Sequence, residues 1–430
     1  MRSANPSQSL ASDLPLTQFE RGSVAVIGAG IIGLTTALNL QQQGFRVTLI
    51  DAEGVAAGAS FGNAGHIATE QVFPLASSGL LRQLPKLLRQ GTLALRWSAL
   101  WSERRFFWLF LTSMRPNRWL QSHRVLRQLC AQAMPAWQRL LQHYQLSDLL
   151  KTHGNLLVFE GPDAEKHAAE QQQSYAAAGV ACRVLSQQQT AAMCPGLSSI
   201  VRCSLYFEQT GHCISPGLLC QRLAQAFSDA GGTIQLDRVT ALLSADGVAV
   251  TLSSGAAARY RHVVVCTGAA SNQLLSPLGI KLPLTAERGY HLHVRLSEQP
   301  QLAVASFDRK MILTPMVDGL RICGLVEFAG VGAQPDWRHL QGLQTHAKAL
   351  WPALAQQTGQ CSTQWSGERP TIADSLPVVG DSGVAGIWLN LGHQHLGLTF
   401  AAYSAELLLG AMLGNSAVNL MPALSCQRFK

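Results

Sequence analysis

The stretch "SVAVIGAGIIGLTTALNLQQQGFRVTLID", residues 23–51, decides the fold. Its first six residues are mostly apolar and β-branched, which is typical of a buried parallel strand. Residues 29–44 have the pattern of a helix with a glycine at its end, and residues 45–51 form a second apolar run. This order of strand, glycine-rich turn, helix and strand predicts a βαβ unit at the start of an α/β fold.

Three glycines in this turn have separate physical roles. Gly28 permits the tight turn, Gly30 lets the backbone approach a pyrophosphate, and Gly33 lets the helix pack closely on the strand. The phosphates then lie at the helix N-terminus, where unpaired N–H groups favour anions. Asp51 ends the second strand, where a carboxylate binds a ribose hydroxyl and disfavours NADP. The sequence therefore predicts a dinucleotide site of the FAD or NAD type.

A loop of small residues, "GASFGNAGHIA" at 58–68, follows the second strand. Small residues make poor core material, but they let the backbone run close to a flat ligand. The alternative interpretation is a plain flexible loop. Later apolar runs predict further strands and helices, and residues 284–328 alternate like an antiparallel sheet.

We therefore expect an α/β protein in which a Rossmann-like domain is interleaved with a second domain of antiparallel sheet plus helices. The predicted nucleotide domain comprises residues 23–78, 195–283 and 365–430. The predicted second domain comprises residues 79–194 and 284–364, and residues 1–22 are expected to form a flexible tail.

Basic and aromatic residues gather in the predicted helices at 79–147. Ten basic residues and a single acid lie between residues 79 and 127, in a chain of formal net charge +8. This pattern suggests contact with a membrane surface or a partner. The alternative is a helical subdomain with core aromatics and a solvated arginine rim. A nucleic-acid partner is not expected, because the sequence has no recognition motif.

The longest strongly apolar run, residues 106–111, is far shorter than the ~20 residues that span a bilayer. The first 22 residues lack the apolar region of a secretory signal. We therefore expect a cytoplasmic chain that can lie on the inner face of the cytoplasmic membrane.

Together these segments resemble the FAD-dependent D-amino acid dehydrogenase branch of the amino acid oxidase superfamily. The matching stretches after residue 68 are "PLASSGLLRQLPKLL" (74–88), "VVVCTGAAS" (263–271), "ERGYHL" (287–292), "GERPTIADSLPVVG" (367–380) and "NLGHQHLGLTFAAYSAELL" (390–408). The resemblance implies FAD, bound noncovalently because no cysteine lies in a flavin-linking motif. It implies hydride transfer from Cα of a small D-amino or imino acid to flavin N5. Electrons are then expected to reach a quinone or another electron-transfer partner.

The resemblance also implies three catalytic residues: Arg369, Tyr290 and His393. Arg369 is expected to bind the substrate carboxylate through its planar fork. Its alternative role is a structural ion pair with Glu368 or Asp374. Alternation along the strand directs only one of Tyr290 and the next residue toward the flavin, and we favour Tyr290.

The residues expected to contact FAD come from seven segments of the chain. They are Gly28, Gly30, Ile31, Ile32 and Gly33; Asp51 and Ala52; Ala59, Ser60, Gly62, Asn63, Ala64, Gly65 and His66; Val239; Thr267 and Gly268; Arg369; and Gly392, His393, Leu396, Gly397, Leu398 and Thr399.

The pair His393 and His395 first suggests a metal site. No cysteine or acid cluster completes such a site at a recognisable spacing, so we expect no metal. The resemblance instead places the backbone of Gly392 and Gly397 around the flavin, and we expect Gly397→Val to abolish FAD retention. Two enzymatic alternatives remain open: an oxygen-using secondary-amine or glycine-type oxidase, and a D-hydroxyproline or D-proline dehydrogenase subunit.

Overall fold

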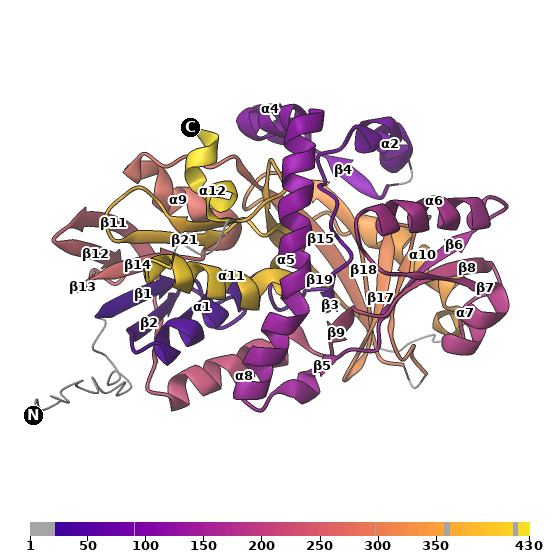
Figure 1. The fold of residues 1–430 in the computed structure, drawn as a ribbon, viewed down its shortest axis with the longest axis horizontal. Coiled ribbons are helices and arrows are strands. Elements are labelled where there is room, and N and C mark those ends of the chain that lie inside the picture. The colour runs from indigo at the N-terminus through magenta and orange to yellow at the C-terminus, as the bar shows by residue number, and fades with distance from the viewer. Residues whose placement is uncertain (1–21, 90, 297, 357–361, 416–419) are drawn as a thin grey trace, which may run out of the picture.

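The computed structural model describes residues 22–89, 91–296, 298–356, 362–415 and 420–430. The predicted tail at 1–22 thus lies outside the described residues, except for Gly22. Two large sheets lie side by side along the long axis of the molecule, and helix α5 (Pro116–His143) stands upright between them in Figure 1.

The first sheet has six strands in the order β10-β2-β1-β14-β21-β20. Five are parallel: β10 (Thr233–Leu236), β2 (Arg46–Asp51), β1 (Ser23–Ile27), β14 (His262–Val265) and β21 (Ile387–Leu391). Strand β20 (Val378–Asp381) is antiparallel and forms one edge. The predicted βαβ unit is confirmed, with helix α1 at Ile31–Gln42.

The two faces of this sheet bury alternate residues of β1. Val24 and Val26 pack in a core with helices α1, α5, α8 (Pro216–Asp229) and α11 (Gly397–Met412). Ala25 and Ile27 pack on the other face against a small antiparallel sheet and α9 (Ser271–Leu275). That small sheet consists of β11 (Val239–Ala245), β12 (Gly247–Leu252) and β13 (Ala257–Tyr260). Because successive side chains point to opposite faces of the sheet, and both faces are buried, all residues from Val24 to Ile27 are apolar.

The apolar run at residues 233–242 forms parts of two strands in different sheets. The chain turns at Asp237, whose carboxylate accepts hydrogen bonds from the hydroxyls of Ser253 and Ser254, both 2.6 Å long. A side-chain acceptor that fixes a corner between apolar runs is not visible to a hydrophobic pattern.

The second sheet has nine strands, eight of them in the order β19-β15-β18-β17-β16-β6-β8-β7, while β4 pairs with β18. Its longest strands are β15 (Leu284–Val294), β18 (Gly319–Phe328) and β19 (Ser362–Ile372). The others are β4 (Leu93–Leu95), β6 (Asn155–Glu160), β7 (Arg183–Ser186), β8 (Val201–Phe207), β16 (Ala303–Ser306) and β17 (Met311–Met316). The domain boundaries remain predictions; β8 belongs to this sheet although the predicted boundary at 195 places it with the nucleotide domain.

Helix α10 (His339–Leu350) covers one face of the second sheet, where Leu343 packs with Leu292 and Ile322. The opposite face meets the loop of residues 61–65, which belongs to the nucleotide fold. A second small sheet links the two parts through β3 (His66–Ile67), β9 (Gly211–Cys213) and β5 (Leu150–Lys151).

The predicted basic, tryptophan-rich region forms four helices. They are α2 (Ser78–Arg89), α3 (Trp97–Ser102), α4 (Arg104–Ser113) and α5. The remaining helices are α6 (Ala164–Ala177), α7 (Gln187–Met193) and α12 (Met421–Leu424). Within the described ranges, the helices are all too short or too polar to cross a bilayer.

Candidate active site

The carboxyl ends of the parallel strands gather most of the predicted cofactor residues at one edge of the first sheet. Since β10, β2, β1, β14 and β21 run in the same direction, the connections that follow them meet there. These connections contain Gly28, Gly30, Ile31, Ile32 and Gly33; Asp51 and Ala52; Val239; Thr267 and Gly268; and Gly392, His393, Leu396, Gly397, Leu398 and Thr399.

The turn after β1 requires two of its glycines. Gly28 has a φ of +106°, and a Cβ there would lie 2.6 Å from the carbonyl oxygen of Cys266. A Cβ at Gly33 would lie 1.7 Å from the carbonyl oxygen of Gly28. Any larger residue at Gly33 would therefore separate the helix from the strand.

The first turn of α1 leaves N–H groups for an anion. The hydroxyl of Ser60 accepts a hydrogen bond from the N–H of Ile31, at 2.9 Å. The N–H groups of Ile32 and Gly33 have no acceptor among the described residues. Free first-turn N–H groups and the helix dipole favour a phosphate at this position.

Asp51 is oriented by the backbone around it. Its Oδ2 accepts a hydrogen bond from Ala29 N–H at 2.7 Å, and its Oδ1 accepts from Glu53 N–H and Gly54 N–H at 2.8 and 2.9 Å. Because each carboxylate oxygen has two lone pairs, Oδ2 can accept a further hydroxyl donor.

The loop that contains Ala59, Ser60, Gly62, Asn63, Ala64, Gly65 and His66 runs between the two large sheets. The Nδ1 atom of His291 lies 3.0 Å from the carbonyl oxygen of Gly62. The indole of Trp365 lies against Gly62, where a Cβ would be 2.1 Å from the ring. Glycine at position 62 is therefore required by contact with the second sheet.

His393 is buried, with 2 % of its surface exposed, and burial lowers its pKa to about 3. Neither ring nitrogen has a hydrogen-bond partner among the described residues. Such a neutral ring needs a polar neighbour, since an unmade buried hydrogen bond costs about 1–3 kcal/mol. Gly392 has a φ of +77°, so the turn before His393 favours glycine.

Gly397 is less constrained than the sequence suggested. It lies in the first turn of α11 with a helical φ of −56°, and a Cβ there would lie 3.7 Å from His393 Cβ. That distance is an ordinary contact, so the protein itself does not demand glycine at 397.

Arg369 forms an ion pair with Glu287 across strands β19 and β15. Its Nη1 lies 3.0 Å from Oε1 of Glu287, whose Oε2 accepts a hydrogen bond from Thr371 at 2.9 Å. The structural partners suggested from sequence are wrong: Glu368 pairs with Arg288 and Asp374 pairs with Arg428, both at 2.7 Å. Those acids are engaged elsewhere, whereas Glu287 lies opposite Arg369 in register.

The guanidinium of Arg369 lies over Gly289, where a Cβ would be 2.2 Å from Nη2. The Nη2 and Nε atoms have no protein acceptor among the described residues, and a quarter of the side chain is exposed. One edge of the fork is thus held by Glu287 while the other edge is open.

The prediction that Tyr290 points toward the flavin is not supported by its position. Because Glu287 and His291 face the loop, alternation turns Tyr290 to the other face of β15. There its hydroxyl donates to Glu327 and accepts a hydrogen bond from Asp336 N–H, and only 1 % of its surface is exposed. His291 takes the place that was assigned to Tyr290.

Two further histidines lie close to this face. His395 feels the charges of Glu287 and Arg369, and burial lowers its pKa. His66 lies with Nε2 at 2.8 Å from Glu70 Oε1 and Nδ1 at 3.2 Å from the Gly211 carbonyl. Burial opposes the charged form of His66, but the charge and hydrogen bond of Glu70, together with the Gly211 carbonyl, outweigh burial and raise the pKa of His66.

Sequence reasoning missed Glu287, Arg321 and Trp365, and it weighed His291 only as the alternative to Tyr290. They meet the loop or Arg369 only through the pairing of β15, β18 and β19. The alternation of Glu287, Gly289 and His291 was visible, but the face that it presents depends on which neighbour each strand takes.

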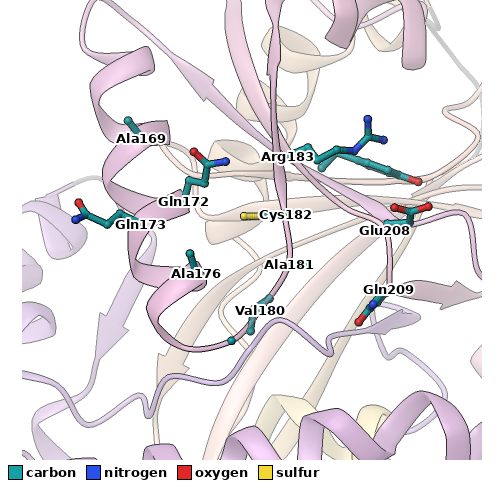
Figure 2. A pocket seen from close by; sticks show the side chains of 12 residues that line it. Ala169, Gln172, Gln173, Ala176, Val180, Ala181, Cys182, Arg183, Glu208 and Gln209 are labelled. Carbon is teal, nitrogen blue, oxygen red and sulfur yellow. The ribbon is translucent and has the colours of Figure 1, made fainter.

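A separate surface hollow of about 480 Å³ lies between α6 and the end of β8 (Figure 2). Gln172, Gln173, Arg183 and Glu208 line it. The hollow contains none of the residues gathered at the carboxyl ends of the parallel strands. We therefore place the candidate active site at those strand ends and not in this hollow.

A nucleotide-type sheet joined to a second sheet with an arginine–carboxylate pair fits a dinucleotide-dependent oxidoreductase. Residues 23–410 match the family described as FAD dependent oxidoreductase, and the chain belongs to this family. It is 29% identical over 417 residues to a D-amino-acid oxidase of Bradyrhizobium diazoefficiens, covering 94% of this chain and 98% of the relative. It is 30% identical over 411 residues to D-amino acid dehydrogenase 2 of Pseudomonas aeruginosa, covering 90% and 93%.

The fold is similar to that of glycine oxidase from Geobacillus kaustophilus, with a TM-score of 0.75 at 18% identity. That match covers 95% of this chain and 98% of the solved one. The residues fit FAD, because the turn after β1 leaves N–H groups free for a pyrophosphate and buried His393, which follows β21 in the same sheet, has two unpartnered ring nitrogens. The chain is therefore an FAD-dependent oxidoreductase.

Proposed function

We propose that the protein oxidises the Cα–N bond of a D-amino acid or a cyclic imino acid and passes the electrons to a quinone-type acceptor. The observation that carries the proposal is the guanidinium of Arg369, which has one free edge. It lies on the sheet face that meets the loop of residues 59–66, here called the flavin loop. The names of the sequence relatives support the D-amino acid as the substrate class.

Arg369 would bind the substrate carboxylate through its open edge, Nη2 and Nε. Charge-assisted, bidentate pairs of this kind fix orientation as well as position. Glu287 holds the opposite edge at Nη1, and Thr371 holds Glu287 in turn. We infer that the ion pair with Glu287 fixes the plane of the guanidinium. Arg369 can therefore form a structural ion pair through Nη1 and bind the substrate carboxylate through Nη2 and Nε.

FAD supplies the two-electron acceptor chemistry when it is bound. The protein orients the substrate, and orientation can supply about 7–11 kcal/mol of the barrier reduction. The reacting amine must be neutral, so a group near Arg369 has to accept its proton. His395, whose ring interacts electrostatically with Glu287 and Arg369, is the candidate for this role; burial lowers its pKa, so the ring is neutral but weakly basic.

The test of substrate class is anaerobic reduction of the flavin by a panel of D- and L-amino acids and cyclic imino acids. We expect D-amino acids or imino acids with a free carboxylate to reduce the flavin, and their decarboxylated amines to fail. Reduction by L-enantiomers alone would contradict the proposal.

The acceptor needs a separate test, because one relative is named an oxidase and another a dehydrogenase. The reduced protein is mixed with oxygen or with a soluble quinone in a stopped-flow instrument. We expect rapid reoxidation by the quinone and slow reoxidation by oxygen. Rapid reoxidation by oxygen would favour the second candidate, an oxygen-using amine oxidase.

Exposed tryptophans on α3 and α4 support a membrane-bound acceptor. Trp97, Trp101 and Trp108 are 81%, 76% and 65% exposed. Helix α2 buries none of its residues, and its basic side chains Arg82, Lys86 and Arg89 lie beside exposed leucines. Helices α2 and α4 lie on the same side of the molecule, at the top of the view in Figure 1. Tryptophans with cations are typical of an anionic bilayer surface.

This surface predicts binding to vesicles that contain anionic phospholipid, weakening as salt is raised. The triple substitution of Trp97, Trp101 and Trp108 by alanine should reduce binding at least tenfold. Leu243, which is 66% exposed on β11, provides the control substitution to alanine. Equal binding to neutral and anionic vesicles, or unchanged binding after the triple substitution, would contradict the proposal that this surface binds an anionic membrane.

A further inference from the structure

Arg321 on β18 is a buried arginine whose hydrogen bonds go to the flavin loop. Only 8% of its surface is exposed. Its Nη1 donates to the carbonyl oxygens of Asn63 at 2.7 Å and Phe61 at 3.3 Å. Its Nε is buried and has no partner among the described residues. A buried guanidinium is costly unless its donors and its charge are satisfied.

No carboxylate of the described chain forms an ion pair with Arg321. Asp318, which acts on it electrostatically, lies 3.2 Å from His293 instead, and 64% of its side chain is exposed. Arg288, the buried arginine on the far face of the same sheet, has both Glu368 and Glu327 as partners. The positive charge of Arg321 is therefore uncompensated beside the loop.

The position of Arg321 separates it from the proposed substrate anchor. Arg369 pairs in register with Glu287, and Arg321 pairs in register with His293, further along β15. Six residues of strand correspond to about 20 Å at a rise of roughly 3.3 Å per residue. The hydrogen bonds of Arg321 go to the carbonyl groups of Phe61 and Asn63, so the loop is its partner.

The loop is held by the second sheet at three consecutive carbonyl groups. Arg321 binds those of Phe61 and Asn63, and His291 contacts that of Gly62. The N–H groups of Gly62 and Ala64 have no acceptor among the described residues. Fixing the carbonyls in this way leaves these two donors available to a ligand.

We propose that Arg321 is a positioning residue: it clamps the flavin loop through two backbone carbonyls and places an unpaired positive charge beneath it. The clamp sets the Gly62 and Ala64 donors for FAD. The charge favours a flavin that gains negative charge on reduction. This inference rests on the FAD site and not on the identity of the substrate.

The experiment compares Arg321→Lys, Arg321→Gln and Arg321→Met with the wild-type protein. We expect the dissociation constant for FAD, measured by flavin fluorescence with the apoprotein, to rise at least tenfold in Arg321→Met. Arg321→Lys keeps the charge but loses the fork, and Arg321→Gln keeps donors but loses the charge. The reduction potential of the flavin should therefore fall in Arg321→Gln and Arg321→Met and stay near wild type in Arg321→Lys.

Hydrogen exchange of the apoprotein provides a readout without cofactor. Peptides that contain residues 61–65 should exchange faster in Arg321→Met, while β1 and β2 keep their protection. Arg183→Met is the matched control, since Arg183 is exposed and stacks on Tyr206. Unchanged FAD affinity and unchanged exchange in Arg321→Met would overturn the clamp. A wrong substrate assignment would leave both measurements as expected, so the two failures are distinguishable.

Discussion

On the face of β15 that packs against α10, each arginine is paired with carboxylates. On the face toward the flavin loop, the arginines keep N–H donors or a positive charge without a partner among the described residues. Arg288 has Glu327 and Glu368, and Glu327 also binds Arg96 at 2.6 Å. On the loop side, Arg369 shares Glu287 but leaves one edge free, and Arg321 has only carbonyls. The same strand thus supports a structural network on one side and, on the other, the surface that we propose binds substrate and FAD.

The largest effect should come from removing Arg369. We expect Arg369→Ala to lower kcat/KM for a D-amino acid by about 100-fold or more, since each charge-assisted hydrogen bond contributes about 1.5–3 kcal/mol. Arg369→Lys keeps the charge but loses the planar fork, so its kcat/KM should lie between those of wild type and Arg369→Ala. Steady-state kinetics with dye reduction measure this effect. Wild-type kinetics in Arg369→Ala would mean that the open edge does not bind substrate.

A substitution on the face of β15 that packs against α10 should lower stability and leave the reaction rate unchanged. Tyr290→Phe removes the hydroxyl that donates to buried Glu327, so we expect a loss of about 1–3 kcal/mol in the free energy of unfolding. The value of kcat/KM should stay within about twofold of wild type, because the hydroxyl does not reach the loop face. A large fall in rate with unchanged stability would return Tyr290 to the active site and break the comparison.

The smallest effect is a pH dependence on the loop side. The pKa of His66 is raised above its usual 6.5, so the folded protein holds this proton more tightly than the unfolded chain. The stabilisation is complete below pH 6.5 and is lost as the pH rises through the folded-state pKa. Its size is about 1.4 kcal/mol for each unit by which the pKa is raised.

Urea unfolding of wild type and Glu70→Gln across pH 5.5 to 8.5 measures this contribution. The wild-type advantage should be greatest at the acidic end and shrink toward the alkaline end. An advantage that grows with pH would show that Glu70 acts through another group. Glu406→Gln is a suitable control, because its partner Arg139 does not titrate in this range.

The βαβ unit was predictable because local patterns determine it: apolar runs, three glycines and a terminal acid lie within 29 residues. The same logic placed the edge residues of the first sheet, since parallel strands bring their ends together. The face of β15 was not predictable, because it depends on which side of the strand meets residues 61–63. Arg321 lies 258 residues from Asn63 in sequence, so no short-range pattern connects them.

The most direct test of the central claim is to titrate the FAD-loaded protein with an inert aliphatic carboxylate. Binding is monitored through the change in the flavin absorption spectrum. We expect wild type and Tyr290→Phe to bind it with similar affinity, and Arg369→Ala to bind it at least 100-fold more weakly. If Arg369→Ala binds the carboxylate as tightly as wild type does, Arg369 is not the substrate anchor.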